Sequence, residues 1–332
     1  MKHSKTKTAR RLARAMVAAG LAAAAWHTAP VLAQDAGYPS KPIQIVSSQG
    51  VGGGVDALLR AIGSALGDKG ASVVIDAKPG ANGLLATNAC KTARPDGYTF
   101  CLVNTQYVLL PYLQTKPAYD PVKDFEPVTH IITASLALGI NKHVPAKTFK
   151  ELIAYSKAHP GLLNYVALGP ANPVDIGVET LMKQHGVQWV PIPYKGAGDA
   201  ALAFGANDVQ ITFITSINVA SVTANGGGRV LFVTGDKHAP MLPGVPTLAE
   251  TGMPNPAVGG IWFGLIAPPG TPKALRDKFA ALVADTLKVP AVAQRAAENG
   301  YDTVGNTPEQ FAKFILQEGA SSAKALAGKP KL

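Results

Sequence analysis

The chain has 332 residues, of which 47% are hydrophobic and 16% charged, and this composition excludes an intrinsically disordered protein. Two cysteines cannot build a disulfide-rich scaffold or a four-thiolate zinc site. The formal net charge of +10 is concentrated in residues 1–33, which hold six basic and no acidic side chains. Residues 34–332 hold 25 basic and 21 acidic side chains, an excess too small for a surface that follows nucleic-acid phosphates, so we expect no nucleic-acid partner.

The first 33 residues have the pattern of an export signal. The basic residues precede an alanine-rich apolar run at 15–25, and small side chains stand at Val31 and Ala33, where a signal peptidase reads the chain. The alternatives are an amphipathic surface helix or a retained anchor, but the run is too short to span a membrane. We therefore expect cleavage after Ala33 and a soluble, periplasmic mature protein that begins at Gln34.

The first part of the mature chain alternates predicted strands and helices. Apolar residues at 55, 58, 59, 62 and 66 recur at helical spacing. The predicted elements are a strand at 43–46, a helix after Gly54, a strand at 73–75, a helix at 82–92 and a strand at 98–103. This order is typical of a mostly parallel sheet covered by helices.

The same alternation returns after about residue 130. Further strands are predicted at 131–140, 163–167, 189–194, 209–213, 230–233 and 259–267, and further helices at 149–158, 174–185, 198–204, 272–289 and 307–327. We expect an α/β protein of two lobes, each a mostly parallel sheet flanked by helices. Lobe 1 is expected to hold residues 34–130 plus 248–332 and lobe 2 residues 131–247, with a ligand cleft between them.

The two cysteines, Cys90 and Cys101, lie at the end of one predicted helix and in the next strand. In an oxidising compartment this pair is expected to form a disulfide, which would contribute about 2–3 kcal/mol through loop closure. Two buried free thiols are the alternative.

Two glycine-rich loops each connect a predicted strand to a predicted helix. The first, Gly50-Val-Gly-Gly-Gly54, lacks the Gly-Lys-Ser/Thr ending of a phosphate loop, and Val55 stands where a dinucleotide fingerprint needs its last glycine. What remains is a helix N-terminus with exposed backbone N–H groups, which attracts an anion and lets it approach closely. Asp56 could cap this helix or contact the ligand.

The second loop, residues 194–198, repeats this arrangement in the other predicted lobe. Lys195 could be a plain solvated charge or could face a carboxylate. Together the two loops could hold a small acid between the lobes.

Catalytic and metal-binding patterns are missing from the sequence. It contains no Gly-x-Ser-x-Gly or His-Glu-x-x-His pattern. The histidines of the mature chain, at 130, 143, 159, 185 and 238, are dispersed. We therefore expect a protein that is not an enzyme and that needs no cofactor or metal.

A series of short motifs extends over nearly the whole mature chain. The motifs are Tyr38-Pro-Ser-Lys-Pro-Ile43, Gly52-Gly53 with Asp56, Lys78-Pro-Gly-Ala-Asn-Gly83, Pro95-Asp-Gly-Tyr-Thr99, Asp120-Pro-Val-Lys-Asp-Phe-Glu-Pro127, Pro193-Tyr-Lys-Gly196, Leu242-Pro-Gly-Val-Pro-Thr247, Trp262-Phe-Gly264, Ala267-Pro-Pro-Gly-Thr-Pro272 and Thr307-Pro-Glu-Gln-Phe311. In content and order they resemble the Bug/TctC family, the periplasmic solute-binding proteins of tripartite tricarboxylate transporters.

The resemblance implies a two-lobed type II periplasmic-binding-protein fold that closes on a small organic acid and delivers it to membrane permease subunits. Family members hold the ligand carboxylate mainly through backbone groups and bridging waters from two loops, which match residues 47–56 and 194–198. A monomer is the default for this architecture. A ligand sensor for a membrane histidine kinase and an exported enzyme are the alternatives. The expected ligand-binding residues are Ser47, Ser48, Gln49, Gly52, Gly53, Gly54, Val55, Asp56, Asn104, Gln106, Gly169, Asn172, Asp175, Tyr194, Lys195, Gly196, Ala197 and Gly198.

Several positions depart from the family pattern. The loop at 48–56 has lost an aromatic residue and a threonine hydroxyl, Pro170-Ala-Asn-Pro-Val-Asp175 replaces a Ser/Thr-rich stretch, and Ile214 stands where an aspartate is usual. Asp175 could face an amino or hydroxyl group of the ligand, or it could cap the helix near Val174. Dicarboxylates, aromatic acids and acidic amino acids all fit the predicted loops.

Overall fold

The part of the chain that the computed structural model describes comprises residues 37–169, 172–224, 226–235, 237–253, 259–329 and 331. The chain divides into the units Met1–Ser40 and Lys41–Leu332, and every helix and strand named below belongs to the second unit. The predicted export signal at 1–33 lies outside the described residues. Within these ranges no helix is both long enough and apolar enough to cross a membrane.

The first sheet has six strands, and its order is β11-β4-β10-β3-β1-β2. These strands are β1 (Ile43–Ser47), β2 (Val73–Ala77), β3 (Thr99–Asn104), β4 (Glu126–Ala134), β10 (Ile261–Ala267) and β11 (Asp302–Thr303). β1 runs parallel to β2 and β3, whereas β10 runs antiparallel to β3 and β4. The carboxyl ends of β1 and β3 therefore lie side by side at one edge of the sheet.

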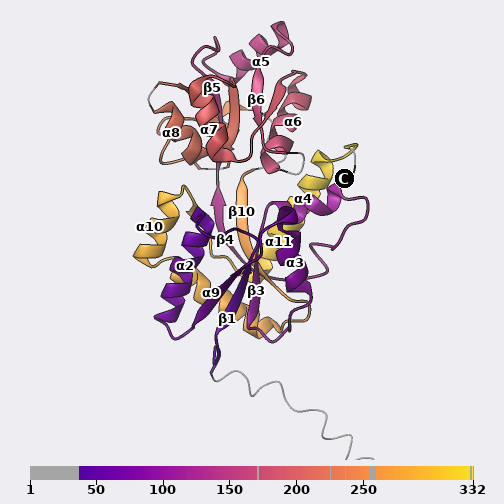
Figure 1. Ribbon diagram of the computed structural model, residues 1–332, viewed down its shortest axis with the longest axis vertical. Helices are drawn as coiled ribbons and strands as arrows, with labels where there is room; N and C mark the ends of the chain where they lie inside the picture. Colours follow the sequence, from indigo (N-terminus) through magenta and orange to yellow (C-terminus); the bar gives the residue numbers. More distant parts are fainter. Residues whose placement is uncertain are drawn as a thin grey trace, which may run out of the picture. The chain divides into compact units, whose positions relative to one another are not determined.

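Helices cover both faces of this sheet, with α2 and α10 on one side and α3 and α4 on the other (Figure 1). The helices are α2 (Gly54–Gly67), α3 (Leu84–Lys91), α4 (Gln106–Leu113), α9 (Lys273–Thr286), α10 (Pro290–Glu298) and α11 (Pro308–Ala325), with a short 3₁₀ turn η3 (Ala81–Gly83). Successive side chains of β3 point to opposite faces of the sheet, so this strand packs against helices on both faces. Phe100 stacks on Phe279 of α9 with ring centroids 3.9 Å apart, while Cys101 points to α3 on the opposite face.

The second sheet has five strands in the order β7-β6-β8-β5-β9. Its strands are β5 (Leu136–Asn141), β6 (Asn164–Ala167), β7 (Val190–Pro193), β8 (Ile211–Thr215) and β9 (Gly228–Val233), and its helices are α5 (Phe149–Ala158), α6 (Pro173–His185), α7 (Ala197–Ala206) and α8 (Ser216–Thr223). A short 3₁₀ turn, η4 (Ala249–Thr251), follows β9. Phe204, Phe213 and Phe232 are fully buried in the core that these elements share.

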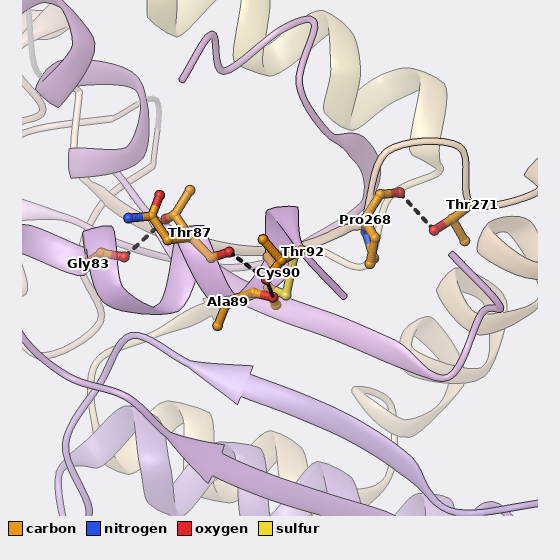
Figure 2. The surroundings of a disulfide bond; sticks show 9 residues. Gly83, Thr87, Ala89, Cys90, Thr92, Pro268 and Thr271 are labelled. Atoms are coloured by element: carbon orange, nitrogen blue, oxygen red, sulfur yellow. Dashed lines mark hydrogen bonds between the residues drawn. A yellow bond between two sulfur atoms is a disulfide. The ribbon is translucent and has the colours of Figure 1, made fainter. Parts of the chain in front are cut away.

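Cys90 and Cys101 form a disulfide, as predicted, and both side chains are fully buried. Figure 2 shows the bridge with the neighbouring side-chain hydrogen bonds from Thr87 to the Gly83 carbonyl and from Thr271 to the Pro268 carbonyl. The disulfide ties α3 to β3, and so it fixes the helix that begins beside Ser48 of the neighbouring strand end. A Cβ on Gly83 would lie 3.6 Å from Ser48 Cβ.

The predicted two-sheet α/β architecture is confirmed, with differences in detail. The strand predicted at 131–140 is two strands, β4 and β5, because the chain leaves one sheet at Ser135 and enters the other. Both sheets are mixed rather than mostly parallel, since β10 in the first and β5 in the second run antiparallel to both neighbours.

Three helices were not expected from the sequence. The helix predicted at 272–289 ends at Thr286 and a separate α10 follows, while α4 and α8 fall in stretches that carry a proline or many β-branched residues, which are poor helix formers. The exact lobe boundaries stay a prediction.

Candidate functional site

The β1–α2 corner comprises residues 47–56 and is shaped by its own short hydrogen bonds. Gln49 N–H donates to Ser47 Oγ over 3.1 Å, and Gly52 N–H donates to Asp56 Oδ2 over 3.0 Å. Gly52 has φ +88°, which favours glycine, and Gly53 precedes the helix with no side-chain cap. The first-turn N–H groups of α2 therefore have no acceptor among the described side chains.

Asp56 lies in the first turn of α2 and contacts the loop before the helix and the next turn of the helix. Besides Gly52, its carboxylate accepts hydrogen bonds from Arg60 Nε over 2.9 Å and from Arg60 Nη2 over 3.2 Å. The hydrogen bond from Arg60 and then that from Gly52 lower the pKa of Asp56. The side chain is buried and both oxygens are occupied, so Asp56 holds the loop before the helix and does not cap α2, and contact with the ligand stays a prediction.

The β6–α6 corner comprises residues 168–175, of which 170 and 171 are outside the described residues. Asp175 Oδ1 accepts the N–H of Leu168 and Oδ2 the N–H of Gly169, each over 2.7 Å. Asn172 caps α6 by accepting the N–H of Val174 over 3.0 Å. Asp175 therefore fastens the loop before the helix, and Asn172 is the cap. Burial raises the pKa of Asp175 despite these hydrogen bonds.

The β7–α7 corner comprises residues 194–199 and has no comparable fastening. Tyr194 N–H donates to the Ala167 carbonyl over 2.9 Å, and Gly196 then precedes α7 in extended backbone without a side-chain cap. Lys195 and Asp199 are both exposed. Within the described ranges no acceptor faces the N–H groups of the first turn of α7, which leaves them available to an anion.

Asn104 and Gln106 lie where β3 ends and α4 begins. Asn104 Oδ1 accepts the Gln106 N–H over 3.0 Å, and Thr105 Oγ1 accepts the N–H of Trp262 over 2.9 Å. Since β3 is the parallel neighbour of β1, this junction lies at the same sheet edge as Ser47 and Ser48.

A cavity of about 440 Å³ opens at the β1–α2 corner. It is lined by Gln49, Gly50, Val51, Gly53, Gly54, Val55, Asp56, Ala134, Thr215, Ile261, Phe263 and Tyr301. Five predicted ligand residues (Gln49, Gly53, Gly54, Val55 and Asp56) are thus brought together. The described lining includes none of the predicted residues at 104–106, 169–175 or 194–198, so this cavity does not unite the two predicted loops.

Seven lining residues were not among the expected ligand-binding residues. Gly50 and Val51 lie within the predicted loop, whereas Ala134, Thr215, Ile261, Phe263 and Tyr301 lie outside it. Thr215 ends β8 directly before α8, but this helix was not expected from the sequence, so the strand-to-helix pattern that marked the two loops did not point to Thr215. Ile261 and Phe263 alternate along β10, but only the tertiary fold shows which face they line. Tyr301 carried no signal, because it reaches the corner from beyond α10.

Gly54 is constrained by this distant segment. A Cβ at position 54 would overlap the side-chain amide of Asn299 and lie 2.9 Å from the Tyr301 hydroxyl oxygen. The first residue of α2 therefore has to be glycine for the segment 299–301 to pack against it.

The electrostatics of the cavity favour an anion held by dipoles. Of the described lining residues, Asp56 alone carries a formal charge, and Arg60 offsets it. The N-terminus of α2 supplies the positive end of a helix dipole. The described residues contain no cluster of three or more His, Cys, Asp or Glu side chains that could hold a metal ion.

The chain is similar over most of its length to known transport receptors and periplasmic binding proteins. The model of the TctC family, described as "Tripartite tricarboxylate transporter family receptor", matches residues 59–329. The periplasmic binding protein BugD is 28% identical with a TM-score of 0.72, covering 89% of this chain and 100% of BugD.

Two further similar structures were solved with ligands. Rpa4515 of R. palustris, solved with adipate, is 27% identical with a TM-score of 0.73, covering 87% of this chain and 97% of Rpa4515. MatC of Rhodopseudomonas palustris, solved with bound malate, is 26% identical with a TM-score of 0.71, covering 87% of this chain and 100% of MatC.

Proposed function

The chain belongs to the TctC family of tripartite tricarboxylate transporter receptors, and from that membership we propose that it captures a small carboxylate and delivers it to the permease subunits of such a transporter. The family is one of periplasmic solute-binding receptors and not of enzymes. Delivery to a permease, rather than to a sensor kinase, follows the role that the family description gives.

The observation that carries this proposal is the N-terminus of α2 at a cavity of about 440 Å³. Gly53 precedes this helix without a side-chain cap, so the first-turn N–H groups can donate to a carboxylate that the helix dipole also attracts. The dicarboxylates malate and adipate in the descriptions of related structures support the same ligand chemistry.

We further propose that the first turn of α7 completes the site when the two lobes close. The predicted residues Ser47, Ser48, Asn104 and Gln106 would then act from lobe 1 (34–130 plus 248–332), and Gly169, Asn172, Tyr194 and Lys195 from lobe 2 (131–247). Closure is a population shift driven by the higher affinity of the closed form for the ligand.

The proposed function requires the protein to be in the periplasm. Export with cleavage after Ala33 would place a monomeric protein in the periplasm. The related protein BugD is a periplasmic binding protein. N-terminal sequencing of the protein recovered from a periplasmic extract tests the cleavage site, and an N-terminus other than Gln34 would contradict it.

A thermal-shift screen of the purified protein against small organic acids, amino acids and neutral controls tests the binding. A ligand at one hundred times its dissociation constant adds about 2.7 kcal/mol to the free energy of unfolding, which is seen as a raised Tm. We expect acids to raise the Tm and neutral compounds to leave it unchanged.

Two variants test whether the helix N-termini hold the acid. Gly53 and Gly196 have backbone angles that any residue adopts, and a Cβ at either position meets no atom closer than 4.0 Å. Gly53→Val and Gly196→Val should therefore fold normally and lose the ligand-induced shift, whereas Gly67→Val, equally open at the far end of α2, should keep it. Unchanged affinity in both variants would rule out this mode of binding.

A further inference from the structure

The lining of the cavity at the β1–α2 corner combines two kinds of group. Its polar groups are the backbone at the N-terminus of α2, the side chains of Gln49, Asp56 and Thr215, and the Tyr301 hydroxyl. Its apolar groups, which we call the apolar wall, are Val51, Val55, Ala134, Ile261, Phe263 and the ring of Tyr301. A ligand that fills this cavity therefore needs one charged end and an apolar body.

Part of the apolar wall is rigid, because Ile261 and Phe263 belong to β10. Phe263 and Ile261 face the cavity, and Phe263 is paired within the sheet to Asn104 of β3 and Ile132 of β4. Between them Trp262 points the other way, where its indole N–H donates to Glu318 over 3.1 Å. Phe263 is thus held by the ladder on both sides, Ile261 by its pairing with Ala134 of β4, and both by the buried tryptophan between them.

Val51 covers the cavity from the loop and is unusual in its exposure. Its side chain is 72% exposed, among the most exposed of the large hydrophobic residues in the described ranges. An apolar side chain on a ligand-facing loop gains free energy only when something apolar covers it.

Tyr301 adds a directed donor. Its hydroxyl oxygen lies next to Gly54, 2.9 Å from where a Cβ on that glycine would be, and so beside the first turn of α2. Among the described residues this hydroxyl forms no hydrogen bond. It can therefore donate to the same carboxylate that the helix N-terminus attracts.

From these observations we infer that the ligand is a monocarboxylic acid with an aryl or alkyl body, whose carboxylate accepts from Tyr301 and whose body packs against Phe263, Ile261 and Val51. This inference rests on the proposed function and narrows it. A second carboxylate would be placed against the apolar wall, where the described lining offers it no cation and burial of an unpaired charge is costly.

The experiment is a thermal-shift and calorimetric comparison of three probe sets on the purified protein. The sets are monocarboxylates (phenylacetate, benzoate and hexanoate), dicarboxylates (malate, succinate and adipate), and phenylacetamide as a neutral isostere. We expect at least one monocarboxylate to bind about tenfold more tightly than every dicarboxylate, and phenylacetamide not to bind.

The outcomes separate this inference from the proposed function. Binding of dicarboxylates alone would overturn the inference and leave a carboxylate receptor standing. No binding by any acid would overturn the proposed function together with the inference. Equal binding of phenylacetamide and phenylacetate would show that the carboxylate is not recognised, and would overturn the inference as well.

Variants of two lining residues test the contacts one at a time. Tyr301→Phe keeps the ring and removes the hydrogen-bond donor. It should lower the affinity for the preferred acid about tenfold. Val51→Ser should lower the affinity for the same acid about threefold, and the loss of affinity should be larger for an acid with a longer alkyl body. The matched controls, Tyr155→Phe in α5 and Val122→Ser in an exposed turn, should leave affinity unchanged. Unchanged affinity in Tyr301→Phe and Val51→Ser would overturn the assigned contacts even if both proteins fold normally.

Discussion

The β1–α2 and β7–α7 corners share a local sequence pattern but differ in how many side-chain hydrogen bonds hold them. Each helix is preceded by an uncapped glycine, Gly53 or Gly196, and has an aspartate as its third residue, Asp56 or Asp199. Asp56 is buried and hydrogen-bonded to Gly52 and Arg60, whereas Asp199 is exposed and, among the described residues, forms no hydrogen bond. A shared sequence pattern therefore does not ensure shared rigidity.

The β6–α6 corner shows that the fastened arrangement is used more than once. Asp175 is again the third residue of its helix, and it accepts two backbone N–H groups of the preceding loop. The β1–α2 and β6–α6 corners, fastened by their aspartates, are preorganised, which lowers the entropic cost of ordering them when a ligand binds. The β7–α7 corner, which we call the bare corner, can adjust to the ligand. Substitutions of the three aspartates and of the disulfide cysteines test this contrast.

The largest expected effect concerns the support behind the β1–α2 corner. Replacing Cys90 and Cys101 together with alanine removes the disulfide that ties α3 to β3, and should lower the free energy of unfolding by about 3 kcal/mol. Ligand affinity should change by less than about threefold, because the corner keeps its own hydrogen bonds. Urea denaturation and calorimetric titration measure the two quantities, and a loss of affinity that exceeds this would show that the corner depends on the bridge.

Asp175→Ala should destabilise the protein by about 2–3 kcal/mol, since it leaves the N–H groups of Leu168 and Gly169 without their acceptors. Asp199→Ala is the matched control at the same helical position and should cost less than about 0.5 kcal/mol. Equal losses in the two variants, measured by urea denaturation, would remove the distinction between fastened and bare corners.

Asp56→Asn should cost about 1–2 kcal/mol at neutral pH, because the neutral amide loses its charge-assisted hydrogen bonds with Arg60. Arg60→Gln, which removes the same pairing from the exposed partner, should reproduce part of the loss. If Asp56→Asn is as stable as the unmodified protein, the carboxylate does not fasten the corner.

The two buried aspartates should respond to pH in opposite directions. The pKa of Asp56 is lowered below 3.8, so its contribution is present above pH 3.8 and is lost as the pH falls through the lowered value. The pKa of Asp175 is raised above 3.8, so its contribution is present below pH 3.8 and is lost as the pH rises through the raised value. Denaturation of the unmodified protein, Asp56→Asn and Asp175→Asn between pH 3 and 7 should give stability differences with slopes of opposite sign, and slopes of one sign would contradict this.

The smallest effect is expected for Asp199→Asn. Its stability should stay within about 0.5 kcal/mol of the unmodified protein, and its affinity for a carboxylate should rise about twofold, because a negative charge is removed from the first turn of α7. The gain should shrink in high salt, where exposed charges are screened. A fall in affinity would instead indicate that Asp199 helps to hold the ligand.

Local features of these corners could be predicted from the sequence. The glycines, the strand and helix on either side of them, and the disulfide all follow from spacing and compartment. Even the pairing of Asp56 with Arg60 could have been read from their separation of four residues on one helix face.

Features that depend on distant segments could not be predicted in this way. Asp175 meets Leu168 and Gly169 only through the path of a loop. Tyr301 reaches Gly54 from the far end of the chain, and the apolar run through Ser135 gives no sign that it divides between two sheets. These relations are set by tertiary packing, which overrides the local pattern.

The alternation along β10 also has an evolutionary consequence. Positions 261 and 263 line the cavity while Trp262 between them is buried on the other face, so substitutions on one face of a single strand can alter what is bound while the tryptophan keeps its place in the core. A lineage can therefore drift from one ligand to another through substitutions on this one face. A combinatorial library confined to positions 261 and 263 would sample that drift directly.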